Sequence, residues 1–135
     1  MRMVIHWEMG ECHSQLHQYK KACESYKEAL NEAKKVHGEK PHRDIATLLM
    51  NIGQTLKDLG DLHEATNIHH QALDMKRELF SLKEIPAMDV ARQLNSLGLC
   101  QWKLGQLEEA IQTFKEGQHL IQTPDNNQEK EILAD

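Results

Sequence analysis

The chain has 135 residues, the size of one domain with one continuous core. Its formal net charge of −5 argues against a nucleic-acid surface, which needs a clear excess of lysine and arginine. No apolar run approaches the roughly 20 residues that span a bilayer, and the N-terminus lacks the unbroken apolar stretch of a signal peptide. Because the three cysteines show no CxxC spacing, we expect free thiols and an intracellular, cytoplasmic location.

Six helices are predicted, and they pair into three helical hairpins. In chain order, the expected ranges are 3–16, 18–37, 43–59, 61–81, 87–104 and 106–121. Apolar and small residues recur at helical spacing on both sides of the turn positions His17, Gly60 and Gly105. With only seven glycines and three prolines, the chain has few places to turn, which favours long helices.

A long repeat underlies the hairpins. Gly10, Gly53 and Gly98 are 43 and then 45 positions apart. After each glycine come a small residue, a ring and a second small residue, always at the same spacing. These residues are Ala22, Ala65 and Ala110, then Tyr26, His69 and Phe114, then Ala29, Ala72 and Gly117. Pro41 and Pro86 each precede their glycine by 12 positions, which confirms the register.

This series resembles the tetratricopeptide repeat, and the resemblance covers residues 3–121. The usual period of that repeat is about 34 residues. The longer period, with the openings PHRDIATLLMNIG and PAMDVARQLNSLG, resembles the subfamily typified by kinesin light chain and nephrocystin-3. The resemblance implies an all-α fold, a right-handed α-solenoid of three hairpins in which neighbours cover one another's apolar surface. The first repeat departs most, with His6, His13 and His17 where apolar residues or glycine are usual.

One domain, residues 1–135, is expected. Its repeats span approximately 3–40, 41–84 and 85–123, followed by the segment 124–135. Two interpretations of that segment stay open: a polar capping helix, which repeat proteins need for solubility, or a truncated fourth repeat. We favour the truncated repeat, and hence a fragment of a longer protein, because Ile132 follows Pro124 at the spacing by which Leu49 and Leu94 follow their prolines.

The resemblance places function in the concave groove lined by the first helix of each hairpin. Transferred by register with the glycines, the groove candidates are Trp7, Glu11, Thr47, Met50, Asn51, Gln54, Lys57, Arg92, Asn95, Ser96, Leu99, Trp102 and Lys103. The amides could pair with a peptide backbone, the cations could receive a carboxylate, and the tryptophans could anchor an interface. The alternative for each polar residue is a solvated helix face, and for Trp7 it is packing against a preceding repeat.

The charges of the groove candidates exclude one kind of ligand site. Family members that clamp a C-terminal carboxylate carry lysine and asparagine where this chain has Trp7 and Glu11. Because Glu11 would repel a carboxylate, no chaperone-tail clamp is expected. The groove changes from acidic in the first repeat to basic at Arg92 and Lys103, which favours a protein or peptide ligand of mixed charge.

No catalytic site, metal site or cofactor is expected. His13 and His17 are four residues apart, near Cys12 and His6, a spacing that suits zinc. The repeat register instead assigns His13 to helix packing and His17 to the turn. We therefore predict a non-enzymatic adaptor or scaffold that binds a protein or peptide. The alternatives are structural self-association through end repeats or long second helices, giving a weak homo-oligomer, and a metal-dependent role for the histidines.

Overall fold

In the computed structural model, which describes residues 1–122, the chain is a row of six α-helices with no strand among those residues. The helices are α1 (Arg2–Gln15), α2 (Tyr19–His37), α3 (Arg43–Asp58), α4 (Leu62–Ser81), α5 (Ala87–Lys103) and α6 (Leu107–Ile121). Each predicted helix end agrees with the structure to within one residue. The predicted capping helix or fourth repeat falls in 124–135, outside the described residues.

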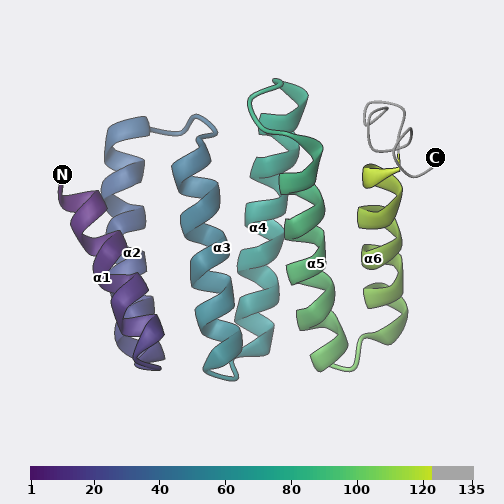
Figure 1. Ribbon diagram of the computed structural model, residues 1–135, viewed down its shortest axis with the longest axis horizontal. Coiled ribbons are helices and arrows are strands. Elements are labelled where there is room, and N and C mark those ends of the chain that lie inside the picture. The colour runs from purple at the N-terminus through teal and green to yellow at the C-terminus, as the bar shows by residue number, and fades with distance from the viewer. Residues whose placement is uncertain (123–135) are drawn as a thin grey trace, which may run out of the picture.

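The helices pair as antiparallel hairpins, and the hairpins stand side by side in chain order (Figure 1). The turns within the hairpins lie at one end of the stack, and the connections between hairpins lie at the other (Figure 1). This is the all-α helical repeat fold that the sequence predicts. No helix in residues 1–122 has the length and apolar character needed to span a membrane.

The three turns within the hairpins share one geometry. His17, Gly60 and Gly105 all adopt a left-handed backbone, with φ of 59°, 86° and 83°. The following N–H closes each turn onto a carbonyl five residues earlier, as in Gln18 N–H to His13 at 2.8 Å. Glycine adopts this conformation without steric cost, whereas His17 is strained there.

A glycine opposite a ring joins the two helices of every hairpin. A Cβ on Gly10, Gly53 or Gly98 would come within 2.6–2.7 Å of the ring of Tyr26, His69 or Phe114, respectively. The helices approach so closely that only glycine fits, and this explains the constant spacing between glycine and ring in the sequence.

The core consists of small residues within the hairpins and large residues where hairpins stack. Ala22, Ala65 and Ala110 are buried inside the hairpins. Large side chains of α3 and α5, among them Ile52 and Leu94, fill the space against the preceding hairpin. Two adjoining clusters result, one centred on α2 and α3 and one on α4 and α5.

His69 occupies the ring position of the second hairpin and is completely buried. Its Nδ1 lies 2.8 Å from Nε2 of Gln93, which comes from the next hairpin. Burial, with a smaller contribution from the positive charges of Lys57 and Lys76, lowers the pKa of His69 to about 4. The imidazole is therefore neutral at pH 7 and packs as a core ring, as its place in the repeat predicts.

Candidate functional site

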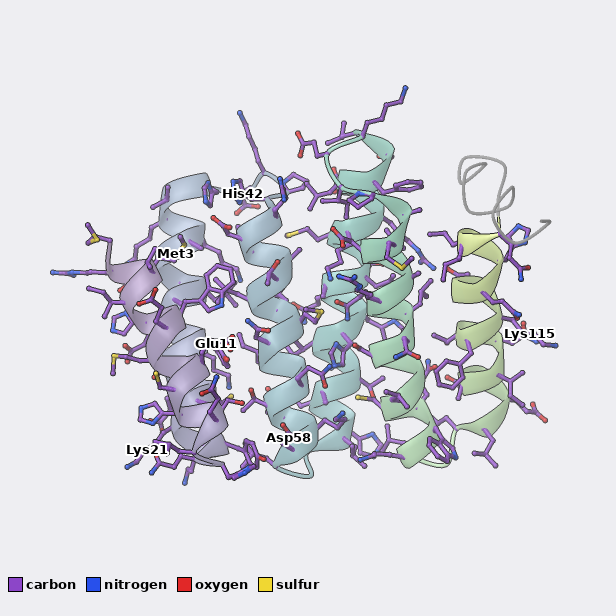
Figure 2. The ribbon with its side chains drawn as sticks, in the orientation of Figure 1. Met3, Glu11, Lys21, His42, Asp58 and Lys115 are labelled. Carbon is purple, nitrogen blue, oxygen red and sulfur yellow. The ribbon has the colours of Figure 1, made fainter. Side chains whose placement is uncertain are left out.

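The predicted groove residues lie on α1, α3 and α5, and the structure brings only some of them together. His42 and Asp58 mark the two ends of α3 (Figure 2), and the candidates Thr47, Met50 and Gln54 lie between them in sequence. Two neighbouring pockets on α3 and α5 gather six candidates. These are Thr47, Met50, Gln54, Arg92, Asn95 and Ser96.

The larger pocket is a cleft of about 500 Å³ between α3, α5 and α6. Met50, Gln54, Arg92, Asn95 and Ser96 line it from the first helices. Met88 and Ala91 extend the lining on α5, and the α6 residues are Phe114, Gly117, Gln118 and Ile121. The sequence prediction missed the α6 wall because it considered only first helices.

A hydrogen bond joins two of the predicted residues that line the cleft. Gln54 Nε2 donates to Ser96 Oγ at 3.3 Å and so ties α3 to α5. Ser96 was expected to face the groove, but the structure buries it as part of this packing. It is therefore mainly a contact between repeats, whereas Asn95 beside it is exposed.

A smaller pocket of about 250 Å³ adjoins the cleft and is lined by α3, α4 and α5. Three cationic side chains, Arg43, Lys76 and Arg92, line it together with one carboxylate, Asp89. Thr47, Met50, Ala46, Leu79 and Ile85 complete the lining. Met50 and Arg92 belong to both pockets, so the two form one continuous surface.

Lys76 is the most unusual residue of the smaller pocket. It is only 7% exposed, and its Nζ donates to the sulfur of Met50 at 3.4 Å. Within residues 1–122 it forms no ion pair with a carboxylate. Burial lowers the pKa of Lys76, while nearby Asp89 raises it and Arg92 lowers it. A buried cation with so weak a partner is costly unless an anion approaches it.

Sequence reasoning missed Lys76, although a signal was present. The residue lies within the helical stripe of Ala72, Leu73 and Leu79, all of which are buried. A lysine at a core position of such a stripe indicates either a snorkelling side chain or a buried charge.

The remaining candidates line neither pocket. They are Trp7, Glu11, Asn51, Lys57, Leu99, Trp102 and Lys103. Trp7 is half-buried against the core of the first hairpins, whereas Trp102 is exposed, so the two tryptophans play different parts. Glu11 accepts a hydrogen bond from Tyr26 Oη at 2.9 Å, which ties its carboxylate to its own hairpin.

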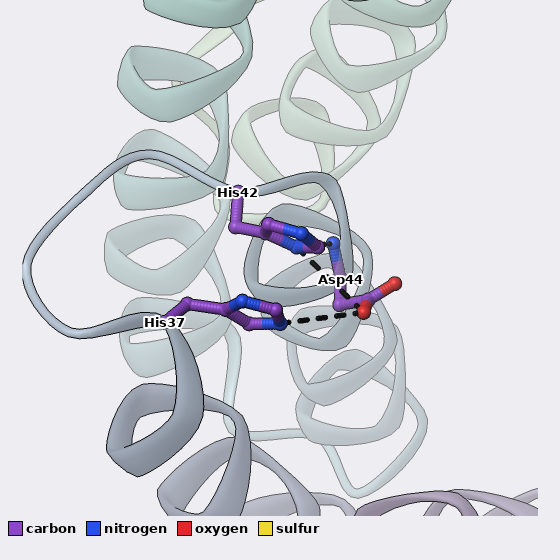
Figure 3. Close-up of side chains that lie close together, drawn as sticks. All are labelled: His37, His42 and Asp44. Carbon is purple, nitrogen blue, oxygen red and sulfur yellow. Dashed lines mark hydrogen bonds and ion pairs between the residues drawn. The ribbon is translucent and has the colours of Figure 1, made fainter.

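The histidines weighed as metal ligands have separate partners. His6 contacts Glu28 at 2.9 Å and Glu32 at 3.1 Å, and His13 contacts Gln18 at 2.9 Å. His17 Nδ1 lies 2.6 Å from the Tyr19 hydroxyl. Within the described residues, three potential ligands converge elsewhere, at His37, His42 and Asp44 in the connection between α2 and α3 (Figure 3).

Comparison with protein families finds the tetratricopeptide repeat twice. One model of this repeat matches residues 2–78, and a second matches residues 91–120. Among curated protein sequences, nothing matches this chain.

Solved structures with this fold include BtubC (BKLC) from P. vanneervenii, at a TM-score of 0.82 and 20% identity over 87% of this chain and 46% of that one. A putative kinesin light chain from Podosopora anserina with TPR-like repeats follows at a TM-score of 0.71 and 14% identity, covering 92% of this chain and 60% of that one. The TPR2AB domain of yeast Sti1, in a complex with pHSP90, has a TM-score of 0.69 at 20% identity over 98% of this chain and 48% of that one. These likenesses concern the fold, including the expected likeness to kinesin light chain repeats.

The present chain spans about half the length of these relatives. Three observations point to the same family: the glycine-to-ring contacts, the paired helices and the match over residues 2–78. The chain belongs to the tetratricopeptide repeat family.

Proposed function

We propose that the protein is a non-catalytic binding module that holds a peptide or protein segment in the cleft between α3, α5 and α6. The observation that carries this proposal is the cleft itself, where predicted groove residues on two repeats meet an apolar wall on a third helix. The fold of the Sti1 domain, which was solved in a complex with pHSP90, supports the general role.

The lining of the cleft suits an extended segment with an apolar side chain. Met50, Met88 and Phe114 provide apolar surface, on which such a side chain could be buried. Gln54, Asn95 and Gln118 provide amides that both donate and accept hydrogen bonds, as a peptide backbone requires. The cleft therefore combines anchoring by burial with recognition of the main chain.

The charges beside the cleft favour an acidic residue in the ligand next to the apolar one. Arg92 lines both pockets, so a segment that enters the cleft can continue to Arg43 and Lys76. A ligand carboxylate there would give Lys76 the strong partner that Met50 does not supply. Within the predicted ligand of mixed charge, we therefore expect one acidic residue to occupy the smaller pocket.

A peptide-display selection tests the proposal. The protein, an Arg92→Glu, Asn95→Ala variant and a Lys115→Glu control are screened in parallel. Lys115 is exposed on α6 and lines neither pocket, so it matches the charge change without touching the cleft. We expect an enriched apolar–acidic motif that the control keeps and the double variant loses. A motif that survives in the double variant, or no enrichment at all, would contradict binding in the cleft.

Self-association remains a second candidate function because α1 exposes several large apolar side chains. Val4, Ile5 and Met9 are each about half exposed on the first helix. An Ile5→Lys substitution would weaken association through this face. Sedimentation equilibrium over a range of concentrations checks it, and a monomer throughout would remove this candidate.

We also propose that the protein is cytoplasmic. All three cysteines are free, with Cys12 exposed and Cys23 and Cys100 buried. Unpaired thiols fit a reducing compartment.

A further inference from the structure

We propose that His37, His42 and Asp44 form a zinc-binding site that ties the end of α2 to the start of α3. His37 is the last residue of α2, His42 caps the N-terminus of α3, and Asp44 lies in the first turn of α3. Gly38, with φ of 69°, turns the chain between them. The site lies in the connection between two repeats and does not depend on the proposed function.

The spacing of the three side chains is close to what zinc requires. The carboxylate oxygen Oδ2 of Asp44 lies 3.6 Å from His37 Nε2 and 3.6 Å from His42 Nδ1. All three ligand atoms lie within 4.8 Å of one another. Zinc bonds of about 2.1 Å in tetrahedral geometry set neighbouring ligand atoms roughly 3.4 Å apart. Figure 3 shows that both rings present a nitrogen toward Asp44.

A buried nitrogen without a hydrogen bond gives this cluster a reason to take a ligand. His37 Nε2 is buried and, among the described residues, has no hydrogen-bond partner. A buried polar atom that forms no hydrogen bond is destabilising, and the 3.6 Å contact with Asp44 Oδ2 is too long to be one. A cation held between this nitrogen and Asp44 would satisfy it and would also neutralise the carboxylate.

Binding requires a small movement of the two rings. They stack with centroids 3.4 Å apart and planes 10° from parallel, so their lone pairs run side by side instead of converging. The rings must tilt about their Cβ–Cγ bonds to meet at one ion. His42 Nδ1 also accepts the Asp44 N–H at 3.0 Å, and a zinc bond replaces that hydrogen bond. The side chains of His37 and His42 are partly exposed, at 22% and 37%, which leaves room for the tilt.

The donor set selects the class of ion. Two imidazoles and one carboxylate suit Zn²⁺, Co²⁺ or Ni²⁺, whereas Mg²⁺ and Ca²⁺ prefer oxygen ligands. Three protein ligands leave a fourth position for water. Because the ligands come from two successive repeats, the bound ion would stabilise their packing. The sequence prediction weighed His6, Cys12, His13 and His17 as metal ligands and overlooked this cluster.

Calorimetric titration of the full chain with zinc chloride tests the proposal, with the visible spectrum of the Co²⁺ form as a second readout. Three variants are compared with the native chain: His37→Gln, His42→Asn and the control His63→Gln. Asparagine at position 42 keeps an N-cap acceptor, so the helix start is preserved while a ligand is lost. His63 is an exposed histidine of α4, outside the cluster, and it reports background binding by the nine histidines.

We expect one zinc ion per chain and a tetrahedral Co²⁺ spectrum for the native protein and the His63→Gln control. Each cluster variant should bind about tenfold more weakly or worse. Zinc should raise the unfolding temperature of the native chain and the control, but not of the variants. Absence of saturable binding by the native chain would overturn the site, as would unchanged affinity in His37→Gln.

Discussion

The first and third hairpins follow the same repeat, yet they differ in how much of each first helix is buried. In α1 only Gly10 is buried, whereas ten residues of α5 are buried, among them Val90, Leu94 and Leu97. In residues 1–122, α5 packs between α4 and α6, while α1 packs mainly on α2. Equivalent positions in a repeat therefore have different energetic weight, because burial depends on the neighbours a helix has and not on its own pattern.

The largest expected effect comes from truncating a buried leucine of α5. Leu94→Ala should lower the free energy of unfolding by about 2–5 kcal/mol, since Leu94 is 1% exposed and truncation leaves a cavity. Leu16→Ala at the end of α1 should change it by about 0.5 kcal/mol or less, because that side chain is 65% exposed. Urea unfolding followed by circular dichroism measures both. Similar losses at the two positions would show that the difference in burial between α1 and α5 does not set their contribution to stability.

The residue at the ring position makes the stability contributed by the second hairpin depend on pH. His69 has a folded pKa of about 4, below the ordinary value of 6.5, so the unfolded state binds the extra proton. The neutral His69 therefore contributes on the order of 3 kcal/mol to the free energy of unfolding above about pH 6.5, and this contribution is lost as the pH falls toward 4. Phe114, the equivalent ring of the third hairpin, has no such dependence.

Urea midpoints at about pH 7 and pH 5 test this dependence in the native chain and a His69→Phe variant. The variant loses the Gln93 contact and starts from a lower stability, so the informative quantity is its change with pH. The fall between the two pH values should be smaller in the variant. An equal fall in both proteins would assign the pH dependence to other histidines.

Substitution of the glycines opposite the rings should destabilise the first hairpin more than the third, the reverse of the order expected for the leucines. An added methyl group meets the ring at 2.6 Å in both Gly10→Ala and Gly98→Ala. Tyr26 is buried and held by Glu11, whereas Phe114 is half-buried and borders the open cleft, into which it can shift. We expect a loss of about 1–3 kcal/mol for Gly10→Ala and a smaller loss for Gly98→Ala.

Chemical denaturation of the two alanine variants measures this order. If Gly98→Ala proved the more damaging, the idea that the cleft accommodates the displaced ring would be wrong. In the proposed function, the same displacement narrows the cleft, so Gly98→Ala should also weaken peptide binding.

The smallest effect concerns the turns. His17→Gly should raise the free energy of unfolding by about 1 kcal/mol, because glycine removes the strain of a left-handed histidine. Loss of the contact with Tyr19 reduces this gain. The reciprocal Gly105→His should destabilise by about the same amount. Thermal unfolding of both variants checks the signs, and destabilisation by His17→Gly would show that the Tyr19 contact outweighs the strain.

The candidate site could be predicted only in part. Met50, Gln54, Arg92 and Asn95 were expected from the repeat register and do meet in the cleft. The α6 wall and Lys76 were not expected, because they belong to second helices that the groove pattern does not include. Ser96 fits the pattern but is buried by its contact with Gln54, a partner 42 residues away.

The local sequence pattern accounts for the six helices, the hairpin turns and the constant spacing between each glycine and its ring. These features depend on spacing within one repeat, where helical geometry fixes which residues face one another. Three features are visible only in the folded protein: the burial of Lys76, the grouping of groove candidates into pockets, and the stacking of His37 and His42 beside Asp44. Each of these depends on how one hairpin stacks on the next, and that arrangement comes from the packing of many side chains at once and not from any local pattern.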